Sequence, residues 1–396
     1  MCVLSSNDGC IVALTPEAKA IGLRRGDPLF KVSDVVRRHQ VVVFSSNMML
    51  YAAMSRRVTN ILRHEVAYVE NYSIDESFCF LDGYDTHHDL TTMMRAIAQK
   101  IRLYTDIPVS VGIAPTKTLA KMGSKFAKRY KGYRGVCAID NDVKRRKALS
   151  MFALSDVWGI GRHTLEKLGY YGIATPLQLA DKSEAWIRTH LTKPGVQTWR
   201  ELNGTPCIDT AEVIRNSSLC TSRSFGQMVH RIDELKAAVA SFASSCAGKL
   251  RGQGSAAHTI TVFVGSNRFR DDLPQYANAA STTLLVPTAD TMELTQAALH
   301  LLHTLFRPGV SYKKAGVVVS DIVPATHIQS DLFDPVRQRA ERTRLMKATD
   351  DINRRYGLKT VQLAVEGEHK QPWKVKSEHK SPNYLTDINQ LLTIHI

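Results

Sequence analysis

Hydrophobic and polar positions alternate with two different periods along the first 140 residues, which predicts helices and strands in alternation. Apolar residues four apart, at Leu50, Met54, Val58 and Leu62, mark one predicted helix. The predicted elements are a small helix over 16–21, a helix over 48–64, strands over 66–70 and 78–81, a helix over 90–104, a strand over 109–113 and a helix over 118–129. This order indicates a compact α/β layer with a buried hairpin around residue 75 at its centre.

The second half of the chain has a different pattern. Residues 148–205 predict short, basic helices. Strand, helix, strand, strand, helix and strand then follow over 219–225, 234–251, 259–264, 282–286, 292–306 and 314–322. This is the ferredoxin-like βαββαβ order, and Thr and Ser between the apolar strand residues predict a sheet with one open face. Residues 334–396 predict a small helical or partly disordered appendage.

Positive charge is concentrated in one stretch of the chain. The formal net charge is +15, and residues 117–147 hold eleven Lys or Arg against two acids. Clustered basic charge is typical of proteins that bind a polyanion, and nucleic acid is the obvious one. The alternative is a generally basic protein without such a partner, but the local concentration favours nucleic acid.

Cysteine spacing and hydropathy exclude several classes of protein. The seven cysteines show no C-x-x-C spacing, which argues against a disulfide scaffold or a zinc site. No apolar run approaches the length needed to cross a bilayer, and the N-terminus lacks a signal-peptide pattern. We therefore predict a cytoplasmic protein without a membrane partner.

Asp75 and Glu76 are the first candidates for catalysis. They stand in the turn of the predicted hairpin, where two buried carboxylates are costly unless a positive charge compensates them. A divalent cation is the usual compensation, and oxygen ligands without nearby His or Cys favour Mg²⁺. The alternative is an ordinary solvated turn. The hydrophobic flanking residues favour the metal site.

Lys117, Lys121, Lys125 and Lys128 follow Gly112 at spacings of four, four and three residues, which places them on one helical face. Unpaired like charges at that spacing oppose helix formation, unless bound phosphates neutralise them. We therefore predict a DNA-binding or phosphate-binding row beside the hairpin, with a solvated face as the alternative.

The segment Trp-Gly-Ile-Gly-Arg at 158–162, between short helices, is the pattern of a helix–hairpin–helix. Gly159 and Gly161 would let the backbone approach DNA, so that N–H groups at a helix N-terminus, beside Arg162, hold a phosphate. Such contacts position DNA without reading its sequence. Arg223, near a strand end of the βαββαβ unit, would also suit the DNA backbone, as would Lys313 and Lys314, although each could be solvated.

Gln329, Leu332 and Phe333 stand out in the loop-like region after residue 324. An exposed Leu-Phe pair in a polar segment is expected to be buried by a partner, commonly in a hydrophobic groove of another protein.

The Ser-Ile-Asp-Glu hairpin, the segment 112–121 and the Trp-Gly-Ile-Gly motif, in this order, resemble the Y-family DNA polymerases, specifically the bacterial UmuC-type catalytic subunit of the SOS translesion polymerase. The segments 6–10, 44–47, 156–161, 222–226 and 314–317 strengthen the match. The resemblance covers essentially the whole chain and implies an α+β right-hand polymerase. Its parts would be incomplete fingers over 1–46, an α/β palm over 47–138, a helix-hairpin-helix thumb over 139–206, a ferredoxin-like little finger over 216–324, and a clamp-binding peptide with a C-terminal tail over 325–396.

The resemblance also implies roles for particular residues. A DNA polymerase V-like subunit performs error-prone translesion synthesis in the SOS response, joining deoxynucleoside triphosphates to a damaged primer-template with two Mg²⁺ ions. Asp75 would be a metal ligand, Glu76 would assist at the primer-side metal, and Lys128 would contact the nucleotide phosphates. Lys19, where the family often has Arg, would reach phosphate as a point charge. The peptide at 329–333 resembles a binding site for the β sliding clamp, and a UmuD′-like dimer and the RecA filament are further implied partners.

One departure from the family affects the expected activity. The family begins with a strand that carries another metal-binding Asp and an aromatic residue that excludes ribonucleotides, whereas this sequence starts after that segment. Loss of a metal ligand costs orders of magnitude in rate. We therefore expect this N-terminally truncated chain, or chain with a mis-assigned start, to be catalytically crippled, with exposed strand edges in its palm.

Two alternatives remain at this stage. The first is a non-catalytic remnant that binds DNA and the clamp. The second is another palm-type enzyme such as a nucleotide cyclase, which would need neither the Trp-Gly-Ile-Gly motif nor the βαββαβ unit.

Overall fold

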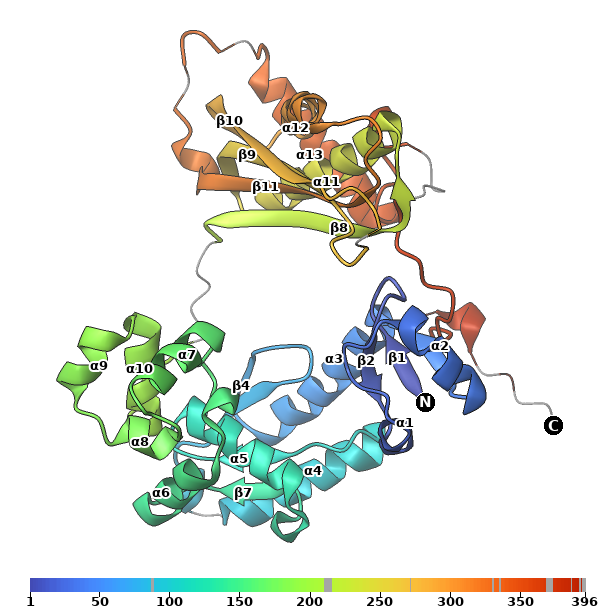
Figure 1. Cartoon of the computed structure of the whole chain (residues 1–396). Helices are drawn as coiled ribbons and strands as arrows, with labels where there is room; N and C mark the ends of the chain where they lie inside the picture. Colours follow the sequence, from blue (N-terminus) through green and yellow to red (C-terminus); the bar gives the residue numbers. More distant parts are fainter. Residues whose placement is uncertain are drawn as a thin grey trace. The chain divides into compact units, whose positions relative to one another are not determined.

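The computed structural model describes residues 1–86, 89–209, 216–270, 272–329, 331–334, 336–367, 373–385, 387–391 and 393. The chain divides into two compact units. The first unit comprises Met1–Asn47 and Ile214–Pro382, and the second comprises Met48–Val213 and Asn383–Ile396 (Figure 1). Across the described ranges, no helix combines the length and the apolar character that crossing a membrane requires.

The first unit begins with a three-stranded sheet, which we call the N-terminal sheet. Its strands and the two helices beside them are β1 (Cys2–Leu4), β2 (Ile11–Leu14), α1 (Pro16–Ala20), α2 (Leu29–Arg38) and β3 (Val43–Ser45). Strand β1 is central, antiparallel to β2 and parallel to β3. Helix α1 begins after Thr15, whose hydroxyl accepts a hydrogen bond from the Ala18 N–H, and Pro16 suits its first turn. The predicted small helix is confirmed as α1, whereas α2 was not predicted.

The rest of the first unit is built on a four-stranded antiparallel sheet, and we call it the C-terminal sheet domain. Its elements are β8 (Ser218–Val229), α11 (Ile232–Gly252), β9 (Ser255–Ser266), β10 (Ala277–Thr288), α12 (Thr291–Leu305) and β11 (Tyr312–Pro324). The predicted βαββαβ order is confirmed. In the sheet, β11 lies between β8 and β9, which makes β8 an edge strand. Helices α11 and α12 lie on one face (Figure 1) and bury Phe225, Phe242 and Tyr312, whereas Ser281 and Thr283 of β10 are exposed.

The second unit contains the elements around the acidic hairpin. They are α3 (Met48–Glu65), β4 (Tyr68–Asn71), β5 (Ser77–Phe80), α4 (Leu90–Thr105), β6 (Val111–Ile113), α5 (Lys117–Arg129) and β7 (Val136–Ala138). Their predicted order is confirmed, but the prediction that the hairpin is buried within a sheet is wrong. The described strands form two separate ribbons, β4–β5 antiparallel and β6–β7 parallel, so each ribbon keeps unpaired edges.

Helix α5 lies directly on the β6–β7 ribbon because a glycine removes the side chain that would separate them. A Cβ atom added at Gly112 would lie 1.9 Å from the Ala120 carbonyl oxygen and 2.3 Å from the Ser124 nitrogen. On the helix side, a Cβ atom at Gly123 would lie 3.0 Å from the Cys137 carbonyl oxygen. This contact fixes the height of the α5 lysines above the ribbon.

A cluster of short helices completes the second unit, as the sequence predicts. Its elements are α6 (Asp142–Met151), η3 (Leu154–Asp156), α7 (Arg162–Tyr170), α8 (Pro176–Ala180), α9 (Glu184–His190) and α10 (Lys193–Leu202). Helix α10 is joined to the start of α5 by Glu201, which is only 1% exposed. The Glu201 carboxylate accepts from the Thr118 N–H at 2.8 Å, and its carbonyl accepts from the Thr116 hydroxyl at 2.9 Å.

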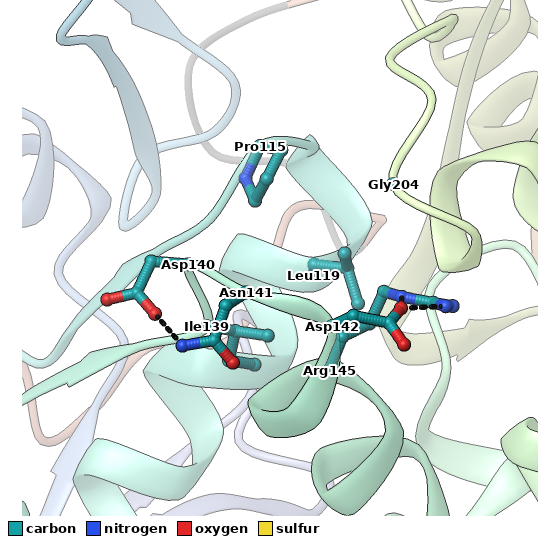
Figure 2. Close-up of a pocket in the computed structure, with 8 residues that line it drawn as sticks. All are labelled: Pro115, Leu119, Ile139, Asp140, Asn141, Asp142, Arg145 and Gly204. Atoms are coloured by element: carbon teal, nitrogen blue, oxygen red, sulfur yellow. Dashed lines mark hydrogen bonds and ion pairs between the residues drawn. The ribbon is translucent and has the colours of Figure 1, made fainter.

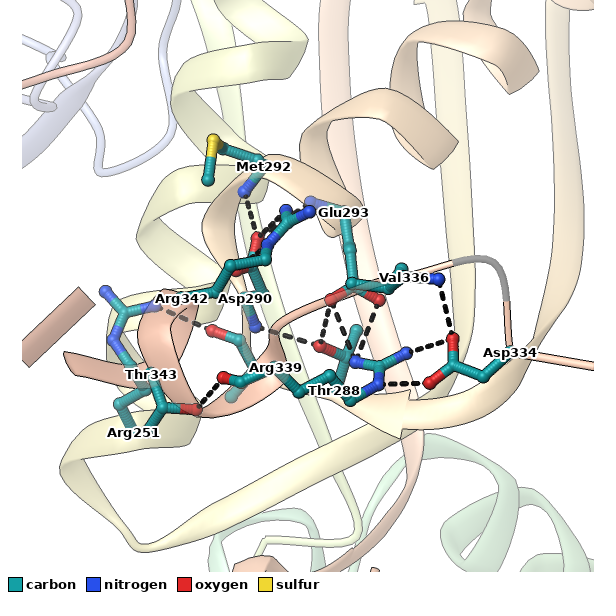
Figure 3. A network of polar contacts seen from close by, with 11 residues as sticks. Arg251, Thr288, Asp290, Met292, Glu293, Asp334, Val336, Arg339, Arg342 and Thr343 are labelled. Atoms are coloured by element: carbon teal, nitrogen blue, oxygen red, sulfur yellow. Dashed lines mark hydrogen bonds and ion pairs between the residues drawn. The ribbon is translucent and has the colours of Figure 1, made fainter. Parts of the chain in front are cut away.

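The predicted helical appendage is present as α13 (Arg339–Tyr356), which belongs to the first unit. Arginine–carboxylate pairs join α13 to the C-terminal sheet domain (Figure 3). The remaining short helical turns are η1 (Tyr84–Thr86), η2 (Lys131–Tyr133), η4 (Ala325–His327), η5 (Ala364–Glu366) and η6 (Ile388–Gln390).

Candidate functional site

Asp75 and Glu76 occupy the turn between β4 and β5, as predicted. The N–H groups of Tyr72 and Ser73 donate to the Glu76 carbonyl at 3.1 and 3.0 Å, and the Ser73 hydroxyl donates to Asp75 Oδ1 at 2.6 Å. Both carboxylates are exposed, so the prediction of a buried turn is wrong. The turn extends beyond the ribbon, where water solvates the charges. The hydrophobic residues beside it are covered by aromatic rings instead of by another strand.

The Cys79 thiol on β5, beside the turn, has a pKa that is shifted by burial. Burial raises the pKa of the Cys79 thiol to about 11. The thiol therefore stays protonated at neutral pH, and Cys79 acts as a small apolar side chain rather than as a nucleophile.

The α5 lysines form the predicted row, but acids face three of them. The pairs are Lys117–Glu70, Lys121–Glu76 and Lys125–Asp156, with nitrogen–oxygen distances of 2.8, 2.8 and 2.6 Å. The prediction of unpaired charges is therefore wrong for these three. Their partners lie on β4, on the hairpin turn and on η3, which the spacing within α5 could not reveal. Lys128, near the end of the helix, is exposed.

Lys117 and Glu70 form the most buried of these pairs. Their side chains are 12% and 7% exposed, and Glu70 Oε1 has no hydrogen-bond partner among the described residues. The Lys117 ammonium also lies 5.3 Å from the ring centroid of Phe78. Removing one member of a buried pair leaves the other charge uncompensated, at a cost of about 3–5 kcal/mol. The sequence prediction did not include Glu70, although an acid directly after the apolar run 66–69 was the available signal.

Lys121 connects the acidic turn to the helix–hairpin–helix motif. Its ammonium lies 2.8 Å from both carboxylate oxygens of Glu76. The same nitrogen lies 4.7 Å from the ring centroid of Tyr72 and 5.2 Å from that of Trp158. The Trp158 indole N–H donates to the Tyr72 hydroxyl at 3.2 Å. Lys121, Glu76, Tyr72 and Trp158 therefore form one contact network, which we call the Lys121 network.

The helix–hairpin–helix glycines have different surroundings. Gly159 has a φ of +91°, and a Cβ atom there would lie 2.2 Å from the Thr198 hydroxyl oxygen, so packing against α10 already explains this glycine. Gly161 has open space at its Cβ position and caps the N-terminus of α7. Arg162 follows with a side chain that is 79% exposed and pairs with Glu166 at 3.4 Å. Gly161 and Arg162 thus remain accessible to a phosphate.

The basic residues predicted for the first unit are accessible to different degrees. Lys19 of α1 and Arg223 of the edge strand β8 are exposed. Lys313 instead turns inward, where its ammonium donates to the Phe225 carbonyl at 2.5 Å, and burial lowers the pKa of this lysine. Its suggested role in binding the DNA backbone is not supported, because the ammonium already serves a backbone carbonyl. Lys314 lies 5.5 Å from the ring centroid of Phe263.

The predicted protein-docking peptide is displayed at the surface. Leu332 and Phe333 are 93% and 81% exposed, and Gln329 is exposed as well. The Phe333 N–H donates to Asp331 Oδ1 at 2.7 Å, and the Asp334 N–H donates to the Asp331 carbonyl at 3.2 Å. These bonds form a turn that presents the two apolar side chains. Ser330 lies outside the described residues.

A small pocket of about 170 Å³ is lined by residues of α5 and α6, by the segment 139–141 between β7 and α6, and by Pro115 and Gly204 (Figure 2). Its polar lining is already paired: Asp140 accepts from Asn141 at 3.0 Å and from Lys144 at 2.8 Å, and Arg145 donates to Asp142 at 3.0 Å. With its acids engaged and no exposed lysine in its lining, the pocket is unsuited to a triphosphate.

The donor set at the hairpin fits one hard cation but not two. Mg²⁺ is commonly held by one or two carboxylates together with substrate phosphates, and Asp75 and Glu76 can supply the carboxylates. Within the described ranges, no group of three or more His, Cys, Asp or Glu side chains is placed to hold a metal ion. To bind the cation, the Glu76 carboxylate must also give up its ion pair with Lys121. The protein ligands for a second ion are not present among these residues.

Comparison with known proteins extends over the whole chain. Residues 1–125 match the impB/mucB/samB family, residues 216–332 match the C-terminal domain of that family, and residues 343–394 match a domain of unknown function, DUF4113. Protein UmuC of Salmonella typhimurium is 40% identical, covering 99% of this chain and 93% of that protein. Protein ImpB of Salmonella typhimurium is 38% identical over 97% of this chain and 91% of its own length. DNA polymerase IV of Moorella thermoacetica is 28% identical over 80% of this chain and 76% of its own.

A solved structure supports the fold independently. A Y-family DNA polymerase chimera of Dbh and Dpo4 superposes with a TM-score of 0.61 at 19% identity, covering 82% of this chain and 91% of that one. The fold is thus that of a Y-family polymerase. Together with the acidic hairpin and the identity to UmuC, this shows that the chain belongs to the impB/mucB/samB family of UmuC-type Y-family DNA polymerases.

Proposed function

We propose that this chain performs error-prone translesion synthesis in the SOS response, by Mg²⁺-dependent, template-directed nucleotidyl transfer. The observation that carries the proposal is the exposed Asp75–Glu76 turn beside the α5 lysines. Fingers over 1–46, palm over 47–138, thumb over 139–206, little finger over 216–324 and a tail over 325–396 are the corresponding assignments. Damaged primer-template DNA and deoxynucleoside triphosphates would be the substrates, which implies a cytoplasmic location.

The roles of individual residues follow from their exposure and their contacts. Asp75 and Glu76 would hold Mg²⁺, which when bound lowers the barrier to attack by the primer hydroxyl and neutralises charge on the triphosphate. Lys128 would contact the nucleotide phosphates, with Lys19 as a further point charge. Lys121 would leave Glu76 as the cation arrives. Lys117 is already committed to Glu70, and it would support the hairpin rather than bind DNA.

DNA would be held by backbone contacts. Gly161, Arg162, Arg223 and Lys125 are candidates, since phosphate contacts position a duplex without reading its sequence. Gly159 would contribute by shaping the motif. Gln329, Leu332 and Phe333 would bind the β sliding clamp. A UmuD′-like dimer and the RecA filament are proposed as partners from the family alone.

A second candidate function is a non-catalytic remnant that binds DNA and the clamp. It is favoured by one observation, that no third acid joins Asp75 and Glu76 in a metal-holding group within the described ranges. Primer extension by the purified 396-residue chain separates the two candidates. Mg²⁺-dependent extension that falls by at least about 100-fold in Asp75→Asn supports the polymerase, because electrostatic stabilisation dominates such chemistry. DNA and clamp binding by the unmodified chain without nucleotide incorporation supports the remnant.

The Asp75→Asn variant is a suitable probe because it changes charge with little structural effect. Asp75 is exposed, and its side chain accepts one hydrogen bond from the neighbouring Ser73. Its thermal unfolding and its DNA affinity should therefore match those of the unmodified chain, which would assign any lost activity to the carboxylate.

A further inference from the structure

Residues 373–381 contact two parts of the first unit that residues 48–213 separate in sequence. At one end, the Trp373 side chain is 5% exposed in the core of the C-terminal sheet domain, with its ring centroid 5.7 Å from that of Phe242. The next residue, Lys374, accepts a backbone hydrogen bond from the Gly226 N–H of β8 at 3.2 Å. This end of the segment is therefore anchored in the C-terminal sheet domain.

The following residues run along the N-terminal sheet and are held through their backbone. The N–H groups of Lys376, Glu378 and His379 donate to Asn7 Oδ1, Asp8 Oδ2 and Ser45 Oγ, at 2.8, 2.8 and 2.9 Å. The Ser45 N–H returns a bond to the His379 carbonyl at 2.9 Å, and the Asn47 amide donates to the Ser381 carbonyl at 3.0 Å. The Asn47 amide also lies 3.2 Å from Ser381 Oγ. The other bonds use backbone groups of the segment, so they depend on where its backbone lies and not on which side chains it carries.

The residues that receive the segment come from sequence motifs that contain no residue of the proposed metal site. Asn7 and Asp8 belong to the segment 6–10, Ser45 and Asn47 to 44–47, and Gly226 to 222–226. Ser45 and Asn47 are each only 1% exposed, although they are polar. A Cβ atom at Gly226 would lie 2.5 Å from the Lys374 carbonyl oxygen, so only glycine admits the segment at this point.

Helix α13 fixes the same C-terminal region to the C-terminal sheet domain a second time (Figure 3). Arg251 of α11 donates twice to Asp350 of α13, both at 2.7 Å. Arg342 of α13 donates twice to Asp290, at 2.9 and 2.8 Å, and Arg339 reaches Glu293 at 2.9 Å. Pairs of this fork-shaped, partly buried kind have defined geometry and are stronger than isolated surface ion pairs.

We propose that residues 339–367 and 373–381, most of which lie in the matched domain of unknown function, act as a strap that fastens the N-terminal sheet to the C-terminal sheet domain. Helix α13 and Trp373 hold the strap to the C-terminal sheet domain, and its backbone at 376–381 holds the N-terminal sheet. The strap joins two parts that are distant in sequence, and it adds to the direct bonds that the Asn7 amide donates to the Ser224 and Phe225 carbonyls of β8, at 3.3 and 2.9 Å. This role is independent of nucleotide incorporation and holds equally for a polymerase or for a DNA-binding remnant.

Hydrogen exchange on the full chain tests the strap, with Gly226→Ala as the variant that removes no existing contact group. The added methyl displaces Lys374, so the amides of 376–379 and of Ser45 should exchange about tenfold faster or more, as local opening becomes easier. Gly265→Ala in β9 is the matched control, because its Cβ atom would come no closer than 3.8 Å to any neighbour. It should leave these amides unchanged.

The outcomes are distinct. The strap is refuted if 376–379 exchange in the unmodified chain as fast as an unfolded peptide, or if Gly226→Ala leaves their rates unchanged. If Gly226→Ala also loosens β9, the variant has disturbed the domain, and Ser45→Ala decides instead, since it removes the acceptor for the His379 N–H. Faster exchange of 376–379 in Ser45→Ala with β9 unchanged supports the strap, and unchanged exchange overturns it.

Discussion

At the scale of single residues, Lys117 and Lys121 of α5 differ in how easily each can be separated from its acidic partner. Lys117 and Glu70 are largely buried, and separating them costs about 3–5 kcal/mol. Glu76 is 47% exposed, and an exposed ion pair contributes only about 0–1 kcal/mol, to which a cation–π contact adds about 0.5–1 kcal/mol. The binding free energy of a cation that arrives with its substrate can exceed the stabilisation of the Lys121–Glu76 pair. Lys121 can therefore yield Glu76 to a metal, whereas Lys117 cannot leave Glu70.

Replacing Lys121 by Met should strengthen metal binding at the hairpin. Without the ammonium, Glu76 no longer has to exchange an ion pair for the cation, and we expect the affinity for Mn²⁺ without nucleotide to rise by about three- to tenfold, the range that corresponds to about 0.7–1.4 kcal/mol. Titration of the apo chain, with free Mn²⁺ followed by electron paramagnetic resonance, measures this directly and does not depend on polymerase activity.

Lys125→Met provides the comparison for this measurement. Lys125 lies one turn further along the same helix, but its partner is Asp156, which is not in the hairpin turn. Its replacement removes the same charge and should leave the Mn²⁺ affinity within about twofold of that of the unmodified chain, since exposed pairs contribute little. Equal affinities for the Lys121→Met variant and the unmodified chain would show that Lys121 does not compete with the metal.

At the scale of elements, the sequence predicted most of what local patterns determine. Period and spacing placed the helices around residues 48–64 and 90–104, the βαββαβ order and the Asp75–Glu76 turn. The predictions that are wrong concern features that depend on contacts between elements. Burial of the hairpin is inferred from its own residues, but its rings Tyr72 and Phe78 pack against Trp158, which lies outside the hairpin. Likewise, the acids opposite the α5 lysines come from three other elements, and no spacing within one helix can predict them.

The contact between α5 and β6 predicts a strong effect from a single methyl group. In Gly112→Ala, the added Cβ atom would overlap backbone atoms, with the Ala120 oxygen at 1.9 Å, so the helix must move away from the ribbon. We expect the free energy of unfolding to fall by about 2–4 kcal/mol, in the range for overpacked cores. Urea denaturation followed by circular dichroism measures it.

Gly169 on α7 gives the opposite expectation for the same substitution. A Cβ atom there has nothing within 4 Å, and its residue lies in a helix, where Ala is favoured over Gly by up to about 1 kcal/mol. Gly169→Ala should therefore be neutral or slightly stabilising. If the two variants lose stability equally, close packing at Gly112 is not the cause.

At the scale of the whole molecule, segments that are far apart in the sequence fold into one compact unit. The first unit combines residues 1–47 with residues 214–382, and the strap residues that hold the N-terminal sheet are 376–381. The sequence predicts only a small helical or partly disordered appendage over 334–396, because backbone hydrogen bonds leave no side-chain pattern to detect. The surface that remains open after this folding includes a peptide whose apolar side chains are almost fully exposed.

That exposed peptide predicts a partner-binding defect without a folding defect. In the double variant Leu332→Ala/Phe333→Ala, two side chains that are 93% and 81% exposed lose atoms that touch little of this chain, so its melting temperature should not change. Apolar anchors buried at an interface each contribute about 2 kcal/mol, so affinity for the β sliding clamp should fall by at least about 30-fold. Surface plasmon resonance with immobilised clamp measures the loss. Leu358→Ala and Phe269→Ala, at side chains that are 93% and 72% exposed elsewhere in the same unit, should bind the clamp normally. If all the variants bind as the unmodified chain does, the clamp uses another surface, and the exposure of Leu332 and Phe333 has a different cause.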